Sequence, residues 1–368
     1  MKYLLATVLL LTPVSAFAQT PTETNSSTRE FQATVETIQT DEEVDGLRHV
    51  VFDARDEDGA TYTIDTADSY VEGLRFNLRA GQNILLQKVV IQDQVDGVYF
   101  VDVVRTARLG WLFALFALAA IAVGLARGAL ALAGLAVTLA VVFAWIFPRI
   151  LGGADPLTTT VIGSVVILAV NMHLTHGFRR STLLAFSSTI VGLGLVVLFA
   201  EAFTTFAHLS GLASEEATFL LFGSDGAIDP RGILLSGIIL GAVGVFDDIA
   251  ITQTETVQEL REMNVRIGSR ELFSRAMRVG RHHIASVVNT LVLAYVGVAM
   301  PLFLLFLLGD NIPGWRFINE ELVAEEIVRT LAGTLALVLL VPISTWFATW
   351  GKKRRLFHCQ AIDKTQKT

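Results

Sequence analysis

The chain has 368 residues, of which 52% are hydrophobic, and its mean hydropathy is +0.56. A soluble globular protein would be less apolar and its apolar residues less clustered, so the composition indicates a polytopic membrane protein. The net charge is −7. Acids outnumber Lys and Arg in residues 19–105, whereas the remainder is mildly basic. This distribution argues against nucleic acid as a partner.

The first 18 residues have the pattern of a secretory signal peptide. Lys2 precedes a short apolar run, and the small-residue tripeptide "AFA" ends at Ala18. A retained anchor helix is the alternative. Residues 19–30 are polar and rich in Thr and Ser, which predicts a disordered leader. The single cysteine, Cys359, is in the basic tail (352–368), so the exported region must fold without a disulfide bond.

Residues 31–105 are predicted to form an exported all-β domain, an OB-like barrel of about five strands. Turn residues separate five runs rich in Val, Ile, Tyr and Phe. These runs are "FQATVETIQ", "RHVVFDAR", "ATYTIDT", "QNILLQKVVIQ" and "VYFVDVVR". The segment "DEDGA", with Gly59 free to adopt a positive φ, predicts a hairpin. This domain could bind an envelope protein.

The rest of the chain, residues 106–351, is predicted to be an all-α bundle of seven transmembrane helices. The expected spans are 110–126, 129–147, 157–175, 182–207, 231–252, 285–308 and 327–350. Lys and Arg are concentrated in alternate loops and in the tail, which predicts an outside N terminus and a cytoplasmic C terminus. The signal peptide predicts the same orientation. We therefore expect a multi-pass protein of a bacterial cytoplasmic (inner) membrane, with the lipid bilayer as its surroundings.

Two connecting segments carry further structure. The outside loop 208–230 contains the apolar piece "TFLLF", which is expected to dip into the membrane interface. Residues 269–281 have an apolar face and an arginine face, which predicts a surface-lying helix capped by Ser269. A helix packed on the floor of the bundle fits this segment equally well.

Asp247 and Asp248 stand where an apolar helix becomes polar. At helical spacing Asp248, Thr252, Glu255 and Glu259 share one face. Intramembrane carboxylates tend to face the bundle interior and to mark ion or proton paths. Small residues upstream should let another helix approach closely. These are Gly237, Gly241 and Gly244. We expect Asp248 to be enclosed, facing spans six and three within reach of Asn289 or Thr290. A helix that simply emerges into water is the alternative for the Asp pair, and it is the preferred interpretation from Glu255 onward.

Span six supplies the polar counterparts Asn289, Thr290 and Tyr295. The predicted ion or transport path therefore comprises Asp247, Asp248, Thr252, Asn289, Thr290 and Tyr295. Asn289 could equally be a structural contact between helices. Four histidines could bind a metal, but their two groups are separate, so no metal site is predicted. They are His173, His176, His282 and His283.

Enzymatic chemistry finds little support in the sequence. It has no hydrolase, zinc-protease or phosphate-loop motif, and the obvious acids are adjacent on one helix rather than facing one another. We predict neither an enzyme nor a cofactor.

Several segments resemble the YibE/F-like family of membrane proteins. These are "GAVGVFDDIAITQ", "ELFSRAMRVGRHHIASVVNTLVLAYVGVAMP" and "ARGALALAGLAVTLAVVFAWIFPRILGGADP". The likeness covers about residues 31–350. It implies an exported β domain followed by a multi-span region, and a permease-like protein without an established substrate. The family's intramembrane Asp matches Asp248, and its Asn-Thr pair matches Asn289 and Thr290. After "GR" the family usually has Asp, whereas here His282 stands.

Two functions fit these observations. The first is a permease-like protein that moves an ion or small solute, with proton or cation coupling at the Asp pair. The alternative is a non-transporting envelope assembly or sensor protein that acts through its β domain.

Overall fold

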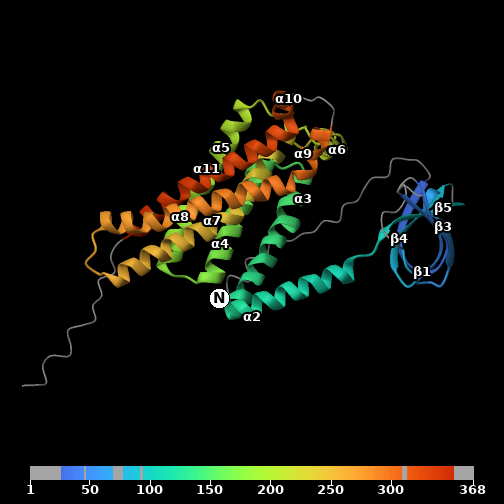
Figure 1. Cartoon of the computed structure of the whole chain (residues 1–368), viewed down its shortest axis with the longest axis horizontal. Coiled ribbons are helices and arrows are strands. Elements are labelled where there is room, and N and C mark those ends of the chain that lie inside the picture. Colours follow the sequence, from blue (N-terminus) through green and yellow to red (C-terminus); the bar gives the residue numbers. More distant parts are fainter. Residues whose placement is uncertain (1–25, 45–46, 69–77, 92–93, 309–312, 352–368) are drawn as a thin grey trace, which may run out of the picture. The chain divides into compact units, whose positions relative to one another are not determined.

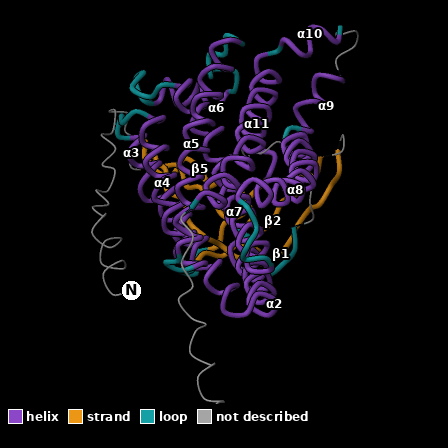
Figure 2. The backbone as a smooth tube through the Cα atoms, turned by 90° about the vertical axis from the view of Figure 1, so that its left-hand side faces the viewer, coloured by secondary structure: helices purple, strands orange, loops and turns teal. Residues whose placement is uncertain are grey.

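The computed structural model describes residues 26–44, 47–68, 78–91, 94–308 and 313–351 (Figure 1). Its described residues divide into two compact units, one up to Val123 and the other from Gly124 onward. The predicted signal peptide, most of the predicted leader and the tail with Cys359 lie outside the described residues. In Figure 2 the strands are orange and the helices, which make up most of the described residues, are purple.

The first unit contains a five-stranded antiparallel sheet in the order β3-β2-β1-β4-β5. The strands are β1 (Ser26–Val44), β2 (Leu47–Asp56), β3 (Thr61–Asp65), β4 (Asn83–Ile91) and β5 (Gln94–Val103), with a short 3₁₀ helix η2 (Thr66–Asp68) after β3. All five predicted strands are confirmed. The sheet is a half-barrel rather than the expected closed barrel, because no hydrogen-bonded ladder joins β3 to β5 among its described residues.

Strand β1 is longer than the sequence pattern suggested. It begins at Ser26, so residues 26–30 belong to the sheet and not to the leader. The reason is pairing with a distant strand, since Ser26 opposes Ile91 and Phe31 opposes Leu86.

Alternating side chains build the core of this half-barrel. Phe52, Ile64, Ile84, Leu86 and Phe100 are almost fully buried. The Phe52 and Phe100 rings meet edge to face, with centroids 6.2 Å apart. The predicted hairpin is confirmed, because Gly59 has a φ of +87° between β2 and β3. The Asp56 side chain accepts a hydrogen bond from the Ala60 backbone N–H at 2.8 Å.

The remaining elements are helices. They are α2 (Thr106–Val141), the π-helical η3 (Val142–Ile146), α3 (Phe147–Leu151), α4 (Pro156–His176), α5 (Arg180–Phe206), α6 (Glu215–Gly223), α7 (Pro230–Met263), α8 (Ser269–Val298), α9 (Met300–Leu308), α10 (Gly314–Asn319) and α11 (Glu321–Trp350). Among the described residues, five helical segments are long and apolar enough to cross a membrane. Counting the bent pair of α8 and α9 as one span makes six.

Helices α5, α7 and α11 pack against one another and form the centre of the second unit (Figure 1). Their contact is apolar, with Val196, Ile238, Phe246 and Leu340 fully buried. Helix α4 packs on α7, and α8 packs on α11 and α7. Close approach of α8 requires Gly280, since a Cβ there would lie 2.7 Å from Val341 Cγ1.

Two predicted boundaries between helices are different in the structure. The first two expected spans belong to one helical run of 46 residues, Thr106–Leu151, interrupted at Leu125 (φ 51°, ψ −131°). The expected surface helix 269–281 is continuous with span six as α8, and a bend of 58° separates α8 from α9.

The expected cap at Ser269 is wrong, because Gly268 is the N-cap residue of α8 and provides no side-chain bond. The alternative for this segment, packing on the bundle, is confirmed. Leu272 and Ala276 are buried in one cluster with Val257 and Ala348. Burial of these apolar side chains against α7 and α11 explains why the segment does not separate from the bundle.

Candidate functional site

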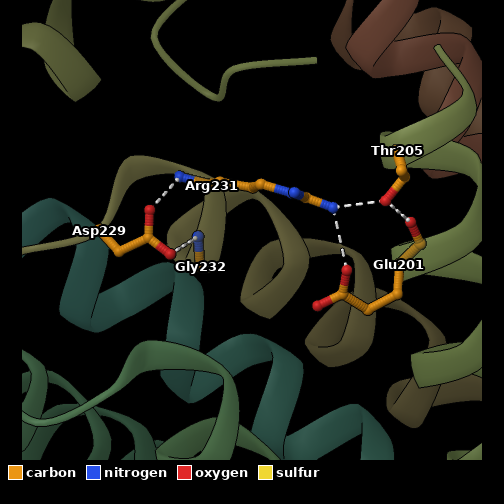
Figure 3. Close-up of polar contacts among 5 residues, drawn as sticks. All are labelled: Glu201, Thr205, Asp229, Arg231 and Gly232. Carbon is orange, nitrogen blue, oxygen red and sulfur yellow. Dashed lines mark hydrogen bonds and ion pairs between the residues drawn. The ribbon is translucent and has the colours of Figure 1, made fainter. Parts of the chain in front are cut away.

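Helix α7 positions the candidate site, and polar contacts fix its first turn (Figure 3). The Asp229 side chain accepts hydrogen bonds from the backbone N–H groups of Arg231 at 3.1 Å and Gly232 at 3.0 Å. Arg231 Nη2 donates to Glu201 Oε2 at 3.0 Å and to Thr205 Oγ1 at 2.6 Å. Asp229 therefore caps α7, and the side chain of Arg231 attaches the beginning of α7 to the end of α5.

One face of α7 carries small and polar residues, which we call the α7 stripe. At about 100° per residue, all six members point within one sector of the helix. The members are Gly237, Gly241, Gly244, Asp248, Thr252 and Glu255. From Gly237 to Glu255 the rise is about 27 Å at 1.5 Å per residue. The stripe is thus about as long as the hydrocarbon core of a bilayer is thick, roughly 30 Å.

The glycine half of the stripe receives polar side chains from two other helices. A Cβ at Gly241 would lie 2.8 Å from Tyr295 Oη of α8, and one at Gly237 would lie 3.5 Å from Arg329 Nη1 of α11. A Cβ at Gly244 would meet nothing within 4 Å. Close approach therefore occurs at Gly237 and Gly241, but Gly244 lies open.

Arg329 belongs to a charged group at the beginning of α11 that the sequence interpretation missed. Its Nη2 lies 3.5 Å from Glu326 Oε1. Glu325 is only 8% exposed, and its Oε1 has no hydrogen-bond partner among the described residues. The signal was available in "EELVAEEIVRT", where Glu325 and Glu326 precede Arg329 by four and three residues. Hydropathy placed the start of the span at residue 327 and left both glutamates outside it.

The Asp pair lies in the middle of the stripe region. Asp247 is half-buried, and its Oδ1 accepts a hydrogen bond from the Asp248 backbone N–H at 2.9 Å. Asp248 is exposed, and no described residue donates a hydrogen bond to its carboxylate.

The expectation that Asp248 is enclosed near Asn289 or Thr290 is therefore wrong for the single chain. Both of those residues are also exposed, and the Thr290 hydroxyl donates to the Ser286 carbonyl at 3.0 Å instead. The physical reason is geometric. Asp248 points in the direction of Gly244, which is the open part of the stripe.

The far end of the stripe meets α4. His176 Nδ1 lies 3.7 Å from Glu255 Oε1. His173 is turned elsewhere, with Nδ1 2.8 Å from the Ala169 carbonyl and its ring 4.8 Å from that of Phe178. His282 and His283 belong to α8. Across the described ranges, no group of three or more His, Cys, Asp or Glu side chains is placed to hold a metal ion.

Charged or ionisable groups thus occur at three levels of α7. The first level, beside Gly237 and Gly241, holds Arg329, Glu326 and Tyr295. Toward the C-terminal end of α7 follow the Asp pair and then Glu255 with His176. Asp248 and Glu255 are separated by about 10 Å along the helix axis. That distance is too long for a direct hydrogen bond, so proton transfer between the levels requires water or a side chain that moves.

A family model described as YibE/F-like protein matches residues 112–354. The matched region contains the whole α7 stripe, the Asp pair, Asn289 and Thr290, and it excludes the half-barrel. No curated protein and no solved structure gives a significant match to the chain.

Proposed function

Because the chain belongs to the YibE/F-like family of membrane proteins, we propose that it is a permease-like protein. It moves an ion or a small solute along the α7 stripe, and Asp247 and Asp248 take up the coupled proton or cation. Thr252 and Tyr295 line the same path, and Asn289 and Thr290 on α8 contact the solute as α8 moves toward the stripe.

The observation that carries this proposal is the exposed carboxylate of Asp248 on the α7 stripe, whose other members are three glycines, Thr252 and, at its far end, Glu255. An ionised side chain at membrane depth is costly unless it faces a protein interior or water. A water-filled path along the stripe provides that environment. Two other charged groups then stand near the ends of the stripe, Arg329 of α11 beside Gly237 and Glu255 of α7 itself.

The proposed topology has seven spans, with the half-barrel outside and the C terminus in the cytoplasm of a bacterial cell. A helical run of 46 residues would be about 69 Å long, more than twice the hydrocarbon thickness. We place two crossings there, before and after the non-helical Leu125. The first, residues 106–124, is about 28 Å long, which suffices to span.

Sidedness of two introduced cysteines tests this topology. With Cys359 replaced by Ser, Ala60→Cys and Arg266→Cys are labelled in whole cells with a membrane-impermeant maleimide. Five crossings separate the two positions if the chain turns at Leu125, so residue 60 is labelled and residue 266 is protected. Four crossings would place both on the same side, and equal labelling would refute the break at Leu125.

Flux through proteoliposomes tests the transport function. The purified chain is reconstituted and assayed for proton, monovalent-cation, divalent-cation and small-anion movement against empty liposomes. Asp248→Asn removes the charge at almost constant volume and is expected to reduce flux to the background of empty liposomes. Asp225→Asn is the matched control, because Asp225 is exposed between α6 and α7 and its φ of 50° is one that Asn adopts readily.

Two outcomes contradict the proposal. Unchanged flux per folded Asp248→Asn molecule would show that the stripe is not the path. Absence of flux for every solute tested would favour the alternative function, envelope assembly or sensing through the half-barrel.

A further inference from the structure

A cavity of about 820 Å³ lies where α5 begins and where α7 and α11 end. It is separate from the α7 stripe, and its walls combine two kinds of side chain. Leu184, Val257 and Ala348 form part of an apolar wall, and Arg179 and Arg180 stand beside it. The cavity therefore suits a ligand that is anionic at one end and apolar at the other.

The arginines of this cavity are available to a ligand. Arg179 and Arg180 are exposed, and neither pairs with an acid among the residues that the structure describes. The one acid on the described lining, Glu262, accepts a hydrogen bond from Gln258 Nε2 at 2.9 Å. The balance of charge in the cavity is positive.

A third arginine sets the shape of the cavity. Arg261 Nη2 donates to the carbonyl oxygens of Ala348 at 3.1 Å and Thr349 at 2.8 Å. It thereby satisfies carbonyl groups near the end of α11 and holds that end against α7. Arg180 also lines the cavity, and an anion bound between two like charges would relieve their mutual repulsion.

The first turn of α5 adds to this preference for an anion. Its N-cap residue, Arg179, gives no side-chain hydrogen bond. The backbone N–H groups of Arg180, Ser181 and Thr182 therefore have no side-chain acceptor in the described part of the chain. Such free N–H groups, together with the helix dipole, favour negative charge.

We propose that this cavity binds the phosphate of an anionic phospholipid headgroup. A guanidinium group matches phosphate oxygens in a two-point geometry. A soluble phosphate ester has the same anionic group, but it would leave the apolar wall of Leu184 and Val257 uncovered. The cavity is also formed by the ends of three candidate membrane spans, which is the level at which headgroups lie. This inference does not depend on the proposed transport function.

Native mass spectrometry of the full-length protein in detergent tests the proposal. The protein is titrated with phosphatidylglycerol, with zwitterionic phosphatidylcholine and with inorganic phosphate. We expect phosphatidylglycerol to be retained in preference to phosphatidylcholine. The double variant R179Q/R180Q should bind phosphatidylglycerol at least about tenfold more weakly, since each arginine contributes to attraction for an anionic lipid.

Two further variants control for folding and for general charge. R179K/R180K keeps both charges and should retain phosphatidylglycerol over phosphatidylcholine. R270Q/R278Q removes two exposed arginines of α8 that have no acidic partner among the described residues, and it should bind like the unsubstituted protein.

Three results would overturn the proposal. An equal loss of phosphatidylglycerol binding in R179Q/R180Q and in R270Q/R278Q would show that the lipid is attracted non-specifically to positive charge. Unchanged binding in R179Q/R180Q would place the lipid elsewhere. Displacement of phosphatidylglycerol by millimolar inorganic phosphate would assign the cavity to a soluble phosphate.

Discussion

Replacing Asp248 by Leu is expected to stabilise the folded protein in a bilayer, although it abolishes the proposed transport. The side chain is exposed on α7, and no described residue donates a hydrogen bond to it. Loss of the carboxylate therefore removes a solvation cost without leaving a buried donor unpaired.

The size of the stability change depends on how deep Asp248 lies in the bilayer. An Asp at the centre of a spanning helix costs roughly 2.5–3.5 kcal/mol on the insertion scale, whereas Leu is favourable by a few tenths. Asp248 lies about 16 Å along α7 from Gly237, in the half of the helix nearer its C-terminal end. Because the cost falls toward the interface, and because water in the proposed path offsets part of it, we expect a smaller gain, about 1 kcal/mol, for Asp248→Leu.

Glu259→Leu is the matched control. Glu259 is also exposed and continues the direction of the α7 stripe, about 16 Å beyond Asp248. It lies outside the hydrocarbon in the proposed topology, so its replacement should change stability by less than about 0.5 kcal/mol. Both variants are measured by equilibrium unfolding of the full chain in mixed lipid–detergent micelles titrated with a denaturing detergent.

A loss of more than about 1 kcal/mol in Asp248→Leu, with Glu259→Leu unchanged, would refute this reasoning. Such a loss is the signature of a carboxylate removed from its partner. It would mean that another chain, or another part of this chain, covers the stripe and pairs with Asp248 in the membrane.

Three further predictions concern packing and pH. Phe52→Ala should cost the half-barrel about 3–5 kcal/mol, a large part of the roughly 4–12 kcal/mol expected for 80 residues, and urea unfolding of residues 26–105 measures the loss. Arg105 donates hydrogen bonds to Asp102 and lowers the pKa of that carboxyl group. The pair therefore contributes fully to stability above the pKa of an unfolded Asp, near 4, and this contribution disappears as the pH falls through the lower pKa of the folded state. In R105Q the pKa of Asp102, followed by NMR titration, should rise. An unchanged pKa would show that Arg105 is not the cause of the lowered value. Gly280→Val should cost about 1–3 kcal/mol by overpacking against α11, and it should lower the Tm of the full chain in a thermal-shift assay. Gly244→Ala, with open space around it, should leave the Tm in that assay unchanged.

The sequence by itself determined the positions of the strands and of the long helices. Alternating apolar residues and the glycine at position 59 predict a strand, a turn and a second strand, because side-chain direction and positive φ are local properties. The apolar runs predicted membrane helices for an equally local reason, since about 20 residues must avoid water together. The residues around Asp248 and Asn289 also predicted the family.

Which residues meet was decided only by tertiary structure. Ser26 joins β1 because it pairs with Ile91, and the leader's polar composition gave no sign of that partner. Arg329 reaches the glycine face of α7, nearly 100 positions earlier in the chain, because α7 and α11 pack together. Hydropathy averages over a window and cannot predict a contact between distant segments.

The exposure of Asp248 is likewise decided by how distant helices pack together. Sequence periodicity placed Asp248 on one face with Thr252 and Glu255, and the structure extends this face upstream to Gly241 and Gly244. Periodicity cannot say which neighbouring helix covers each part of that face. Tyr295 of α8 covers Gly241, but nothing described covers Gly244, so Asp248 remains open because of helix packing rather than because of the residues that surround it in sequence.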